Sequence, residues 1–108
     1  MGTLSTHILD TSRGKPAEGV RITLETLDGK QLGEGVTNAD GRVGEIGPEQ
    51  MDAGDYRLHF AAREYYDGLG VESFYPEITV AFTIADASQH YHVPILLNPY
   101  GFSTYRGS

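Results

Sequence analysis

Three histidines occupy alternating positions in two short runs near the ends of the sequence. His7 lies in the run Leu4–Leu9, and His90 and His92 flank Tyr91 in the second run. Imidazole, with an unperturbed pKa of about 6.5, is suited to acid–base chemistry at neutral pH. Three imidazoles on one surface would also be enough to hold a catalytic zinc ion. Both chemistries require that the two runs lie side by side.

The segments that must position these histidines have the pattern of short β-strands. Apolar and polar residues alternate with a period of two, for example from Val20 to Glu25 and from Ile78 to Ile84, as in half-buried strands. Asp28-Gly29 and Asp40-Gly41 predict tight turns, because glycine readily adopts a positive φ. We predict one short helix over residues 61–67, a loop over 68–76, and eight strands, at 4–11, 20–27, 31–37, 41–46, 54–61, 77–86, 90–98 and 101–105. Many short strands between turns favour an all-β sandwich.

The alternation also assigns a core face to each terminal strand. The residues expected to point inward are Leu4, Thr6, Ile8, Tyr91, Val93, Ile95, Leu97, Phe102 and Thr104. If the three strands are neighbours, their outer face carries His7, Leu9, His90, His92, Leu96, Ser103 and Tyr105. A face that mixes leucine with histidine is typical of an interface or a binding groove. Pro94 cannot donate to a ladder and suggests an edge or a bulge nearby.

Size and charge narrow the possible functions. The 108 residues fit one domain, 1–108, and the net charge of −7 argues against a nucleic-acid partner. The chain has no cysteine, no apolar stretch long enough for a membrane span, and no basic-then-apolar signal at its start. We therefore expect a soluble cytoplasmic protein.

Three segments resemble the 5-hydroxyisourate hydrolases, the enzymatic relatives of transthyretin. They are Leu4–Asp10 (LSTHILD), Thr37–Arg42 (TNADGR) and the tail His90–Ser108, which ends on Tyr-Arg-Gly-Ser. The tail is the most specific segment, because this terminus separates the enzymes from the transthyretin hormone carriers. The resemblance extends over essentially the whole chain, and the one variation, Asn98 where serine is common, falls in a loop.

The resemblance implies a transthyretin-like β-sandwich of two four-stranded sheets with one short helix, assembled as a homotetramer. Active sites would lie at the dimer–dimer interface, at the mouths of a channel bordered by the outer faces described above. The site histidines of the family correspond to His7 and His92, its arginine to Arg42, and its terminal motif to Tyr105–Ser108. The family implies no metal and no other cofactor.

The implied reaction is hydrolysis of a cyclic amide bond in 5-hydroxyisourate, giving 2-oxo-4-hydroxy-4-carboxy-5-ureidoimidazoline. One of His7 and His92 would deprotonate water while the other orients it or donates to the leaving nitrogen, and we favour His92 for the second role. Arg42 would polarise the scissile carbonyl, and Ser108 would position a histidine or the water through its hydroxyl or carboxylate. Arg106 would bind substrate or hold the tail in place. The residues expected to contact the substrate are His7, Arg42, Tyr105, Arg106 and Gly107.

Two alternatives remain open at the level of sequence. A zinc site at His7, His90 and His92 would give a metal-dependent hydrolase. A non-catalytic carrier or binding module is the other, because transthyretin-like sandwiches also serve in such roles. His90 could belong to the site or to its rim, and His59 is interpreted as a surface residue without a role.

Overall fold

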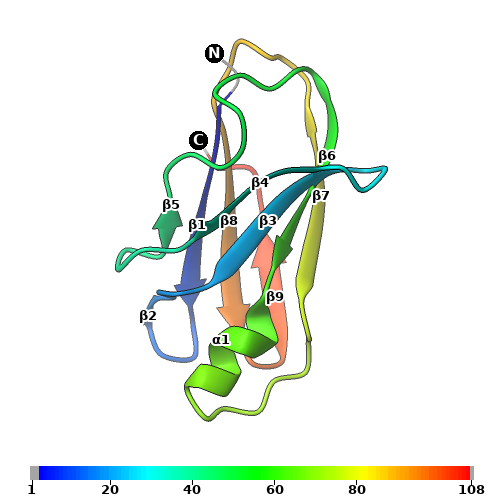
Figure 1. Ribbon diagram of the computed structural model, residues 1–108. Coiled ribbons are helices and arrows are strands. Elements are labelled where there is room, and N and C mark those ends of the chain that lie inside the picture. The colour runs from blue at the N-terminus through cyan, green and yellow to red at the C-terminus, as the bar shows by residue number, and fades with distance from the viewer. Residues whose placement is uncertain (1–2, 108) are drawn as a thin grey trace.

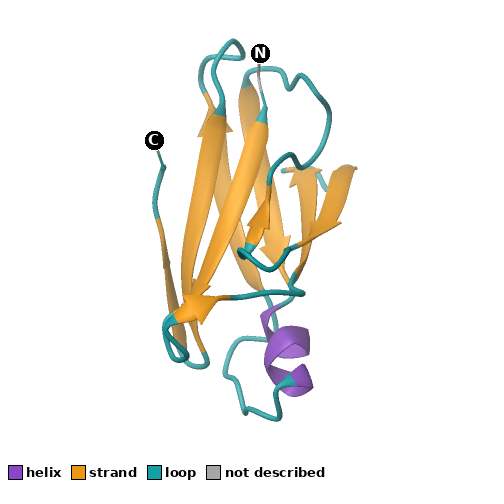
Figure 2. Cartoon of the chain, turned by 90° about the vertical axis from the view of Figure 1, so that its left-hand side faces the viewer, coloured by secondary structure: helices purple, strands orange, loops and turns teal. Residues whose placement is uncertain are grey.

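The computed structural model describes residues 3–107, which form two β-sheets stacked as layers with a short helix at one end (Figures 1 and 2). The all-β sandwich with one short helix is thereby confirmed. No helix in this range is long and apolar enough to cross a membrane. In chain order the elements are β1 (Leu4–Asp10), β2 (Lys15–Pro16), β3 (Arg21–Thr26), β4 (Gln31–Val36), β5 (Arg42–Val43), β6 (Gly54–Phe60), α1 (Ala62–Gly68), β7 (Ile78–Ile84), β8 (Tyr91–Asn98) and β9 (Gly101–Thr104).

The first sheet brings the two ends of the chain together. Its order is β2-β1-β8-β9, and β5 also pairs with β1. β1 and β8 run parallel, with Ser5 opposite His92 and His7 opposite Pro94, while the other pairs in this sheet are antiparallel. The expectation that the three terminal strands are neighbours is confirmed. Because parallel neighbours need a long connection, the whole second sheet is formed by the chain between β1 and β8.

The second sheet is antiparallel throughout, in the order β4-β3-β6-β7. Gly29, with φ of +94°, lies in the predicted turn between β3 and β4. The inner faces of both sheets enclose one apolar cluster, in which Leu24 and Leu58 of the second sheet and Ile8 of the first are fully buried. The core therefore fixes which face of each strand is left outside.

The inward residues predicted for the first and eighth strands are all buried, including Thr6, whose hydroxyl donates to the carbonyl of Val93 at 2.7 Å. On β9 the residues predicted to point inward do lie on the inner side of the strand, but they are exposed rather than buried. Phe102 lies opposite Leu97 on the inner side, yet it is 39% exposed because β9 is the edge of its sheet. Its ring meets the ring of Tyr75 at 5.4 Å.

Two strand predictions need correction. The segment 41–46 forms a strand only at Arg42–Val43, where it pairs with Thr6 and His7 before turning away. β2 was not predicted, because two residues are too few to show an alternation. With these short strands the first sheet has five strands rather than four, while the second has the expected four.

Pro94 lies in a central strand, so an edge position is wrong for it. The N–H of Tyr91 donates to the carbonyl of Thr3, towards β1, whereas the carbonyl of His92 accepts from Gly107 on the opposite side. Residues two apart on a strand direct their backbone polar groups to the same side, so the position of the missing N–H of Pro94, like the carbonyl of His92, faces the tail. There, the ladder is interrupted between the end of β9 and an isolated His92–Gly107 bridge. A proline fits at this point because no donor is required.

The last residue of β1 ties the helix to the first sheet. Asp10 is fully buried and accepts hydrogen bonds from the Ser12 hydroxyl at 2.6 Å and from the Tyr65 hydroxyl at 2.9 Å. Tyr65 belongs to α1, which lies within one residue of its predicted bounds. A buried carboxylate requires such partners. This contact anchors the end of the strand that carries His7.

Candidate active site

The parallel pairing of β1 with β8 and the antiparallel pairing of β1 with β5 place the candidate residues on three adjacent strands. His7 lies directly opposite Arg42 on β5 and opposite Pro94 on β8. His92 is two residue pairs further along the same two strands, opposite Ser5. Alternation then directs His7 and His92 to the same outer face, since Leu4, Thr6 and Ile8 face the core.

The two imidazoles lie close together on this outer face. Their ring centroids are 6.5 Å apart with an interplanar angle of 29°, and both side chains are half-buried. Burial lowers the pKa of His92, and the charges of Arg42, His7 and His90 lower it further, against a smaller opposing effect of Ser5. The lowered pKa favours the uncharged form of His92, which is the form able to accept a proton.

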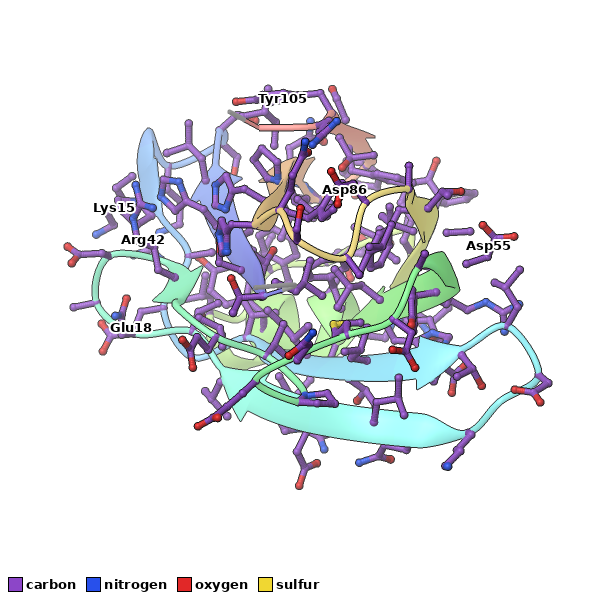
Figure 3. All side chains as sticks on the ribbon, turned by 90° about the horizontal axis from the view of Figure 1, so that it is seen from above. Lys15, Glu18, Arg42, Asp55, Asp86 and Tyr105 are labelled. Atoms are coloured by element: carbon purple, nitrogen blue, oxygen red, sulfur yellow. The ribbon has the colours of Figure 1, made fainter. Side chains whose placement is uncertain are left out.

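Arg42 is held by the tight turn that precedes it. The Asn38 side-chain oxygen accepts from the backbone N–H groups of Asp40 and Arg42, at 2.9 and 3.1 Å. Gly41, with φ of +74°, passes so close to β1 that its carbonyl accepts from the N–H of Ile8 at 2.8 Å. The exposed Arg42 side chain extends from this turn at the β5 end of the sheet, whereas Tyr105 lies at the β9 end (Figure 3).

The tail continues the register of β9 along β8. Thr104 pairs with Ile95, and the next contact, the bridge from Gly107 to His92, keeps that register. Tyr105 is thus opposite Pro94 on the outer side, and Gly107 is opposite His92. The N–H of Gly107 donates to the His92 carbonyl at 2.9 Å. The tail from Thr104 to Gly107 is therefore attached to the strand that bears a candidate catalytic histidine.

Arg106 points to the other side of the tail. Its guanidinium lies 4.4 Å from the ring centroid of Tyr91 and donates to the Gln89 side chain at 3.0 Å. These contacts fit the second of its two expected roles, holding the tail in place. Contact of Arg106 with substrate stays a prediction. Ser108 lies outside the described residues, and its expected catalytic role also stays a prediction.

Sequence reasoning missed Ser5, which the structure connects to His92, and left open whether His90 belongs to the site or to its rim. The Ser5 hydroxyl oxygen lies 2.8 Å from Nδ1 of His92 and 2.9 Å from Nε2 of His90. Nδ1 of His90 in turn bonds to the Thr3 hydroxyl. The signal was present in the sequence, because alternation had already placed His90 on the face of His92 and Ser5 on the face of His7.

A cavity of about 280 Å³ opens between β7 and the tail. His92, Tyr105 and Arg106 border it, together with Tyr91 and residues of β7. His7 and Arg42 do not border this cavity. The three residues His7, Arg42 and His92 therefore share an open face of this chain and not an enclosed pocket.

The zinc alternative lacks geometric support. Among residues 3–107, no three His, Asp or Glu side chains are grouped closely enough to hold a metal ion. Nδ1 of His92 and both ring nitrogens of His90 are engaged by hydroxyl groups instead.

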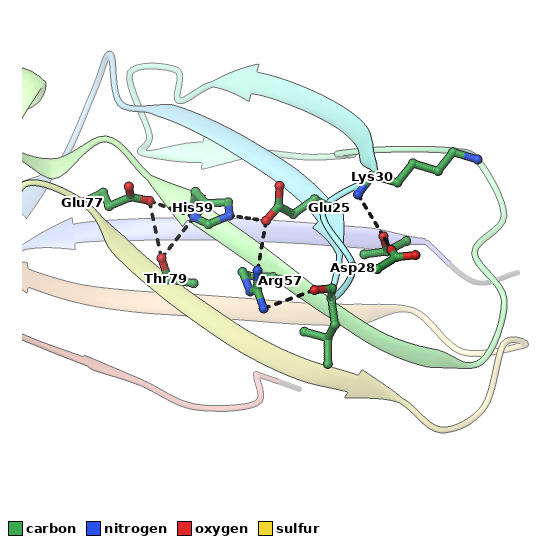
Figure 4. A network of polar contacts seen from close by, with 9 residues as sticks. Glu25, Asp28, Lys30, Arg57, His59, Glu77 and Thr79 are labelled. Carbon is green, nitrogen blue, oxygen red and sulfur yellow. Dashed lines mark hydrogen bonds and ion pairs between the residues drawn. The ribbon is translucent and has the colours of Figure 1, made fainter.

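His59 lies far from this site in the fold, on the outer face of the second sheet (Figure 4). Its Nε2 is 2.6 Å from a carboxylate oxygen of Glu25, and its Nδ1 is 2.8 Å from one of Glu77. The interpretation as a surface residue outside the candidate site fits this position, although the side chain is far from free.

Comparisons with known proteins agree with this arrangement of strands. The model of the HIUase/Transthyretin family matches residues 4–107. The 5-hydroxyisourate hydrolase of Salmonella dublin is 48% identical over 109 residues, covering 97% of this chain and 80% of the relative. The solved 5-hydroxyisourate hydrolase of Klebsiella pneumoniae superimposes with a TM-score of 0.90 at 42% identity, covering 98% of this chain and 99% of that one.

A hormone carrier of the same fold is also similar. Sea bream transthyretin, solved in complex with thyroxine, has a TM-score of 0.87 and 32% identity, covering 96% of this chain and 93% of that one. The resemblance seen in the three sequence segments is thus confirmed along nearly the whole chain. The protein belongs to the HIUase/Transthyretin family.

Proposed function

We propose that this protein hydrolyses 5-hydroxyisourate by adding water across a cyclic amide bond, giving 2-oxo-4-hydroxy-4-carboxy-5-ureidoimidazoline. Relatives at 48% and 43% identity, from Salmonella dublin and mouse, carry the name of this hydrolase. The observation that carries the proposal is the grouping of His7, Arg42 and His92 on one outer face, with His7 and His92 6.5 Å apart. Amide hydrolysis needs a base for water and a positive donor for the developing oxyanion.

In this proposal His92 is the general base. Its lowered pKa keeps the ring neutral, and Nδ1 is bonded to Ser5, which leaves Nε2 for the attacking water. This departs from the assignment favoured on sequence, in which His92 orients water or donates a proton. His7 takes that second role, because it lies between His92 and Arg42 on the middle strand of the three.

Arg42 supplies the donor for the scissile carbonyl oxygen. A guanidinium stays charged at neutral pH and offers two parallel N–H groups to a carbonyl or to an anionic ring. Tyr105 and Gly107 border the substrate from the tail side, and Ser108 positions water or a histidine. Arg106 keeps the tail attached to Tyr91.

The proposed site is completed by other copies of the chain. His7, Leu9, His92 and Leu96 are all half-buried on an outer face that no other element of this chain covers within the described residues. We propose a homotetramer in which a second dimer lies over this face and closes the substrate site, as the channel architecture of the family implies. We also propose that the protein works in the cytoplasm. A chain without cysteine needs no oxidising compartment.

The test generates 5-hydroxyisourate from urate with urate oxidase and follows its absorbance decay with and without the protein. We expect accelerated decay, and a loss of about 10²–10⁴-fold in turnover for His92→Asn. His59→Asn is the matched control, because it removes a histidine from the opposite sheet. Decay no faster than the spontaneous rate with the wild-type protein would overturn the proposal and favour a carrier.

A further inference from the structure

Four side chains form an unbroken line of hydrogen bonds, from His92 through Ser5 and the exposed His90 to Thr3. Nδ1 of His92 is 2.8 Å from the Ser5 hydroxyl oxygen, which is 2.9 Å from Nε2 of His90. Nδ1 of His90 bonds to the hydroxyl of Thr3. Ser5 belongs to β1 and Thr3 directly precedes that strand, while His92 belongs to β8 and His90 directly precedes it. Every hydrogen bond of the line therefore crosses between these two strands, and their parallel pairing fixes its geometry.

With both imidazoles neutral, counting protons leaves only two consistent arrangements of this line. The Ser5 hydroxyl has one proton, so it donates to one histidine and accepts from the other. In one arrangement, Thr3 donates to Nδ1 of His90, Nε2 of His90 donates to Ser5, and Ser5 donates to Nδ1 of His92. The proton of neutral His92 is then on Nε2, which cannot accept one. In the other arrangement every bond is reversed, and Nε2 of His92 carries a lone pair.

We infer that Ser5 and His90 form a proton relay that holds His92 in its basic tautomer and carries its proton to the protein surface. The inference rests on the proposed function, in which Nε2 of His92 accepts a proton from water. As that bond forms, the Nδ1 proton of His92 passes to the Ser5 oxygen, and the Ser5 proton passes to Nε2 of His90. Hydroxide adds to the acyl carbon as the C=O π bond opens to an oxyanion beside Arg42, and the positive charge now lies on His90. The C–N bond then breaks as the C=O bond re-forms, and His7 donates a proton to the leaving nitrogen.

The electrostatic surroundings favour this direction of transfer. Half-buried His92 faces Arg42 from β5 and His7 from β1, and both the burial and these charges lower its pKa. Within residues 3–107, no carboxylate bonds to the His92 ring and balances a charge there. His90 precedes β8 and is exposed, outside the half-buried residues over which the proposed second dimer lies, so an imidazolium at that position remains hydrated. Ser5 is therefore a positioning residue that acts through His92.

The relay is tested with Ser5→Ala and Ser5→Thr, using Thr23→Ala as control. Thr23 carries a hydroxyl on the outer face of the second sheet, opposite Glu34 and His59 and away from the proposed site. We expect Ser5→Ala to lower kcat about 10- to 100-fold with little change in KM, which is part of the usual acid–base contribution. Ser5→Thr keeps a hydroxyl and should recover most of the loss, while Thr23→Ala should match the wild type.

Two further readouts separate a relay from a purely structural role. The solvent isotope effect on kcat should indicate several moving protons in the wild type and fewer in Ser5→Ala. NMR of protein labelled with ¹⁵N-histidine should show the proton of neutral His92 on Nδ1. A proton on Nε2 would overturn the inference even if Ser5→Ala failed to fold. Wild-type kcat in Ser5→Ala would also overturn it, while a large loss in His92→Asn would leave the proposed function standing.

Discussion

Gly107 lies so close to the imidazole of His92 that a Cβ atom at this position would come within 2.5 Å of Cδ2 of the ring. It would also lie 3.2 Å from Cγ, so the ring plane itself blocks any side chain here. The bridge between the two backbones prevents the tail from moving away without losing its hydrogen bond at 2.9 Å. The tail thus limits the orientations that His92 can adopt.

Gly107→Ala should therefore turn the His92 ring or detach the tail, and either change misplaces the proposed base. We expect turnover to fall at least about 10-fold, because misplacement by about 1 Å can cost as much as 10²-fold. The melting temperature should change little, since the tail is at an edge. Gly44→Ala is the control, as a Cβ atom there meets nothing within 4 Å. Equal turnover in the two variants would contradict the constraint on His92.

Arg42 should set the acid limit of activity through its charge. The pKa of His92 is lowered, first by burial and next by Arg42, so the neutral base persists below pH 6.5. Arg42→Gln removes one cause of this lowering, so the acid limb of the kcat/KM profile should move to higher pH. Turnover should also fall about 10²–10³-fold for loss of the oxyanion donor.

Arg42→Lys separates these two effects, because it keeps the charge and loses the fork-shaped donor. We expect its acid limb to stay near that of the wild type while its turnover remains low. NMR titration of His92 in the three proteins measures the same shift directly. An unchanged His92 titration in Arg42→Gln would show that Arg42 does not act on this histidine.

The strand faces were predictable because burial leaves a regular mark on the sequence. Alternation, with the assumption that the terminal strands are neighbours, placed His7 and His92 on one face, and the core positions of β1 and β8 followed from alternation itself. The rule failed at Phe102, which points inward but remains exposed, because alternation gives direction and cannot indicate that a strand is an edge.

The contacts of the candidate site that the sequence did not predict depend on the register in which the strands pair. Short-range sequence patterns do not contain that register. Ser5 meets both His90 and His92 only because β1 and β8 are parallel neighbours paired in one specific alignment. Arg42 would have passed for a solvent-exposed hairpin residue without the family resemblance. Its position beside His7 comes from the pairing of β5 with β1, and the strand predicted at 41–46 gave no indication of that partner.

Gly41 should be essential for a different reason from the other turn glycine, Gly29. Both have a positive φ, of +74° and +94°, so alanine should cost either turn about 1 kcal/mol. A Cβ atom at Gly41 would also lie 2.4 Å from the carbonyl oxygen of Ile8, whereas one at Gly29 meets nothing within 4 Å. Only Gly41→Ala should therefore move the turn that carries Arg42.

Thermal unfolding and the decay assay, applied to both variants, check this expectation. Gly29→Ala should lower the melting temperature modestly and leave turnover unchanged. Gly41→Ala should lower both, with turnover reduced towards that of Arg42→Gln. Normal turnover in a folded Gly41→Ala protein would show that the turn tolerates displacement without moving the arginine.

His59 should contribute stability that depends on pH. Both of its ring nitrogens face carboxylates, at 2.6 Å from Glu25 and 2.8 Å from Glu77, and two such bonds together require a protonated ring. Burial alone would lower the pKa of His59, but the hydrogen bonds and charges of the two glutamates outweigh it and raise the pKa. Folding therefore favours the imidazolium.

Because its pKa is higher in the folded than in the unfolded protein, His59 stabilises the fold when it is protonated. This contribution to the free energy of unfolding is fully present below the unfolded pKa of about 6.5 and is lost as pH rises through the folded pKa. His59→Gln should consequently destabilise the protein more at pH 5.5 than at pH 8.5, with turnover unaffected. Urea unfolding of both proteins at the two pH values measures the difference.

Glu77→Gln should reproduce part of the effect, because it removes one of the two carboxylates that hold the proton on His59. A difference between wild type and His59→Gln that is the same at both pH values would mean that the ring is neutral in the folded protein, with the Thr79 hydroxyl donating to Nδ1 from 3.0 Å.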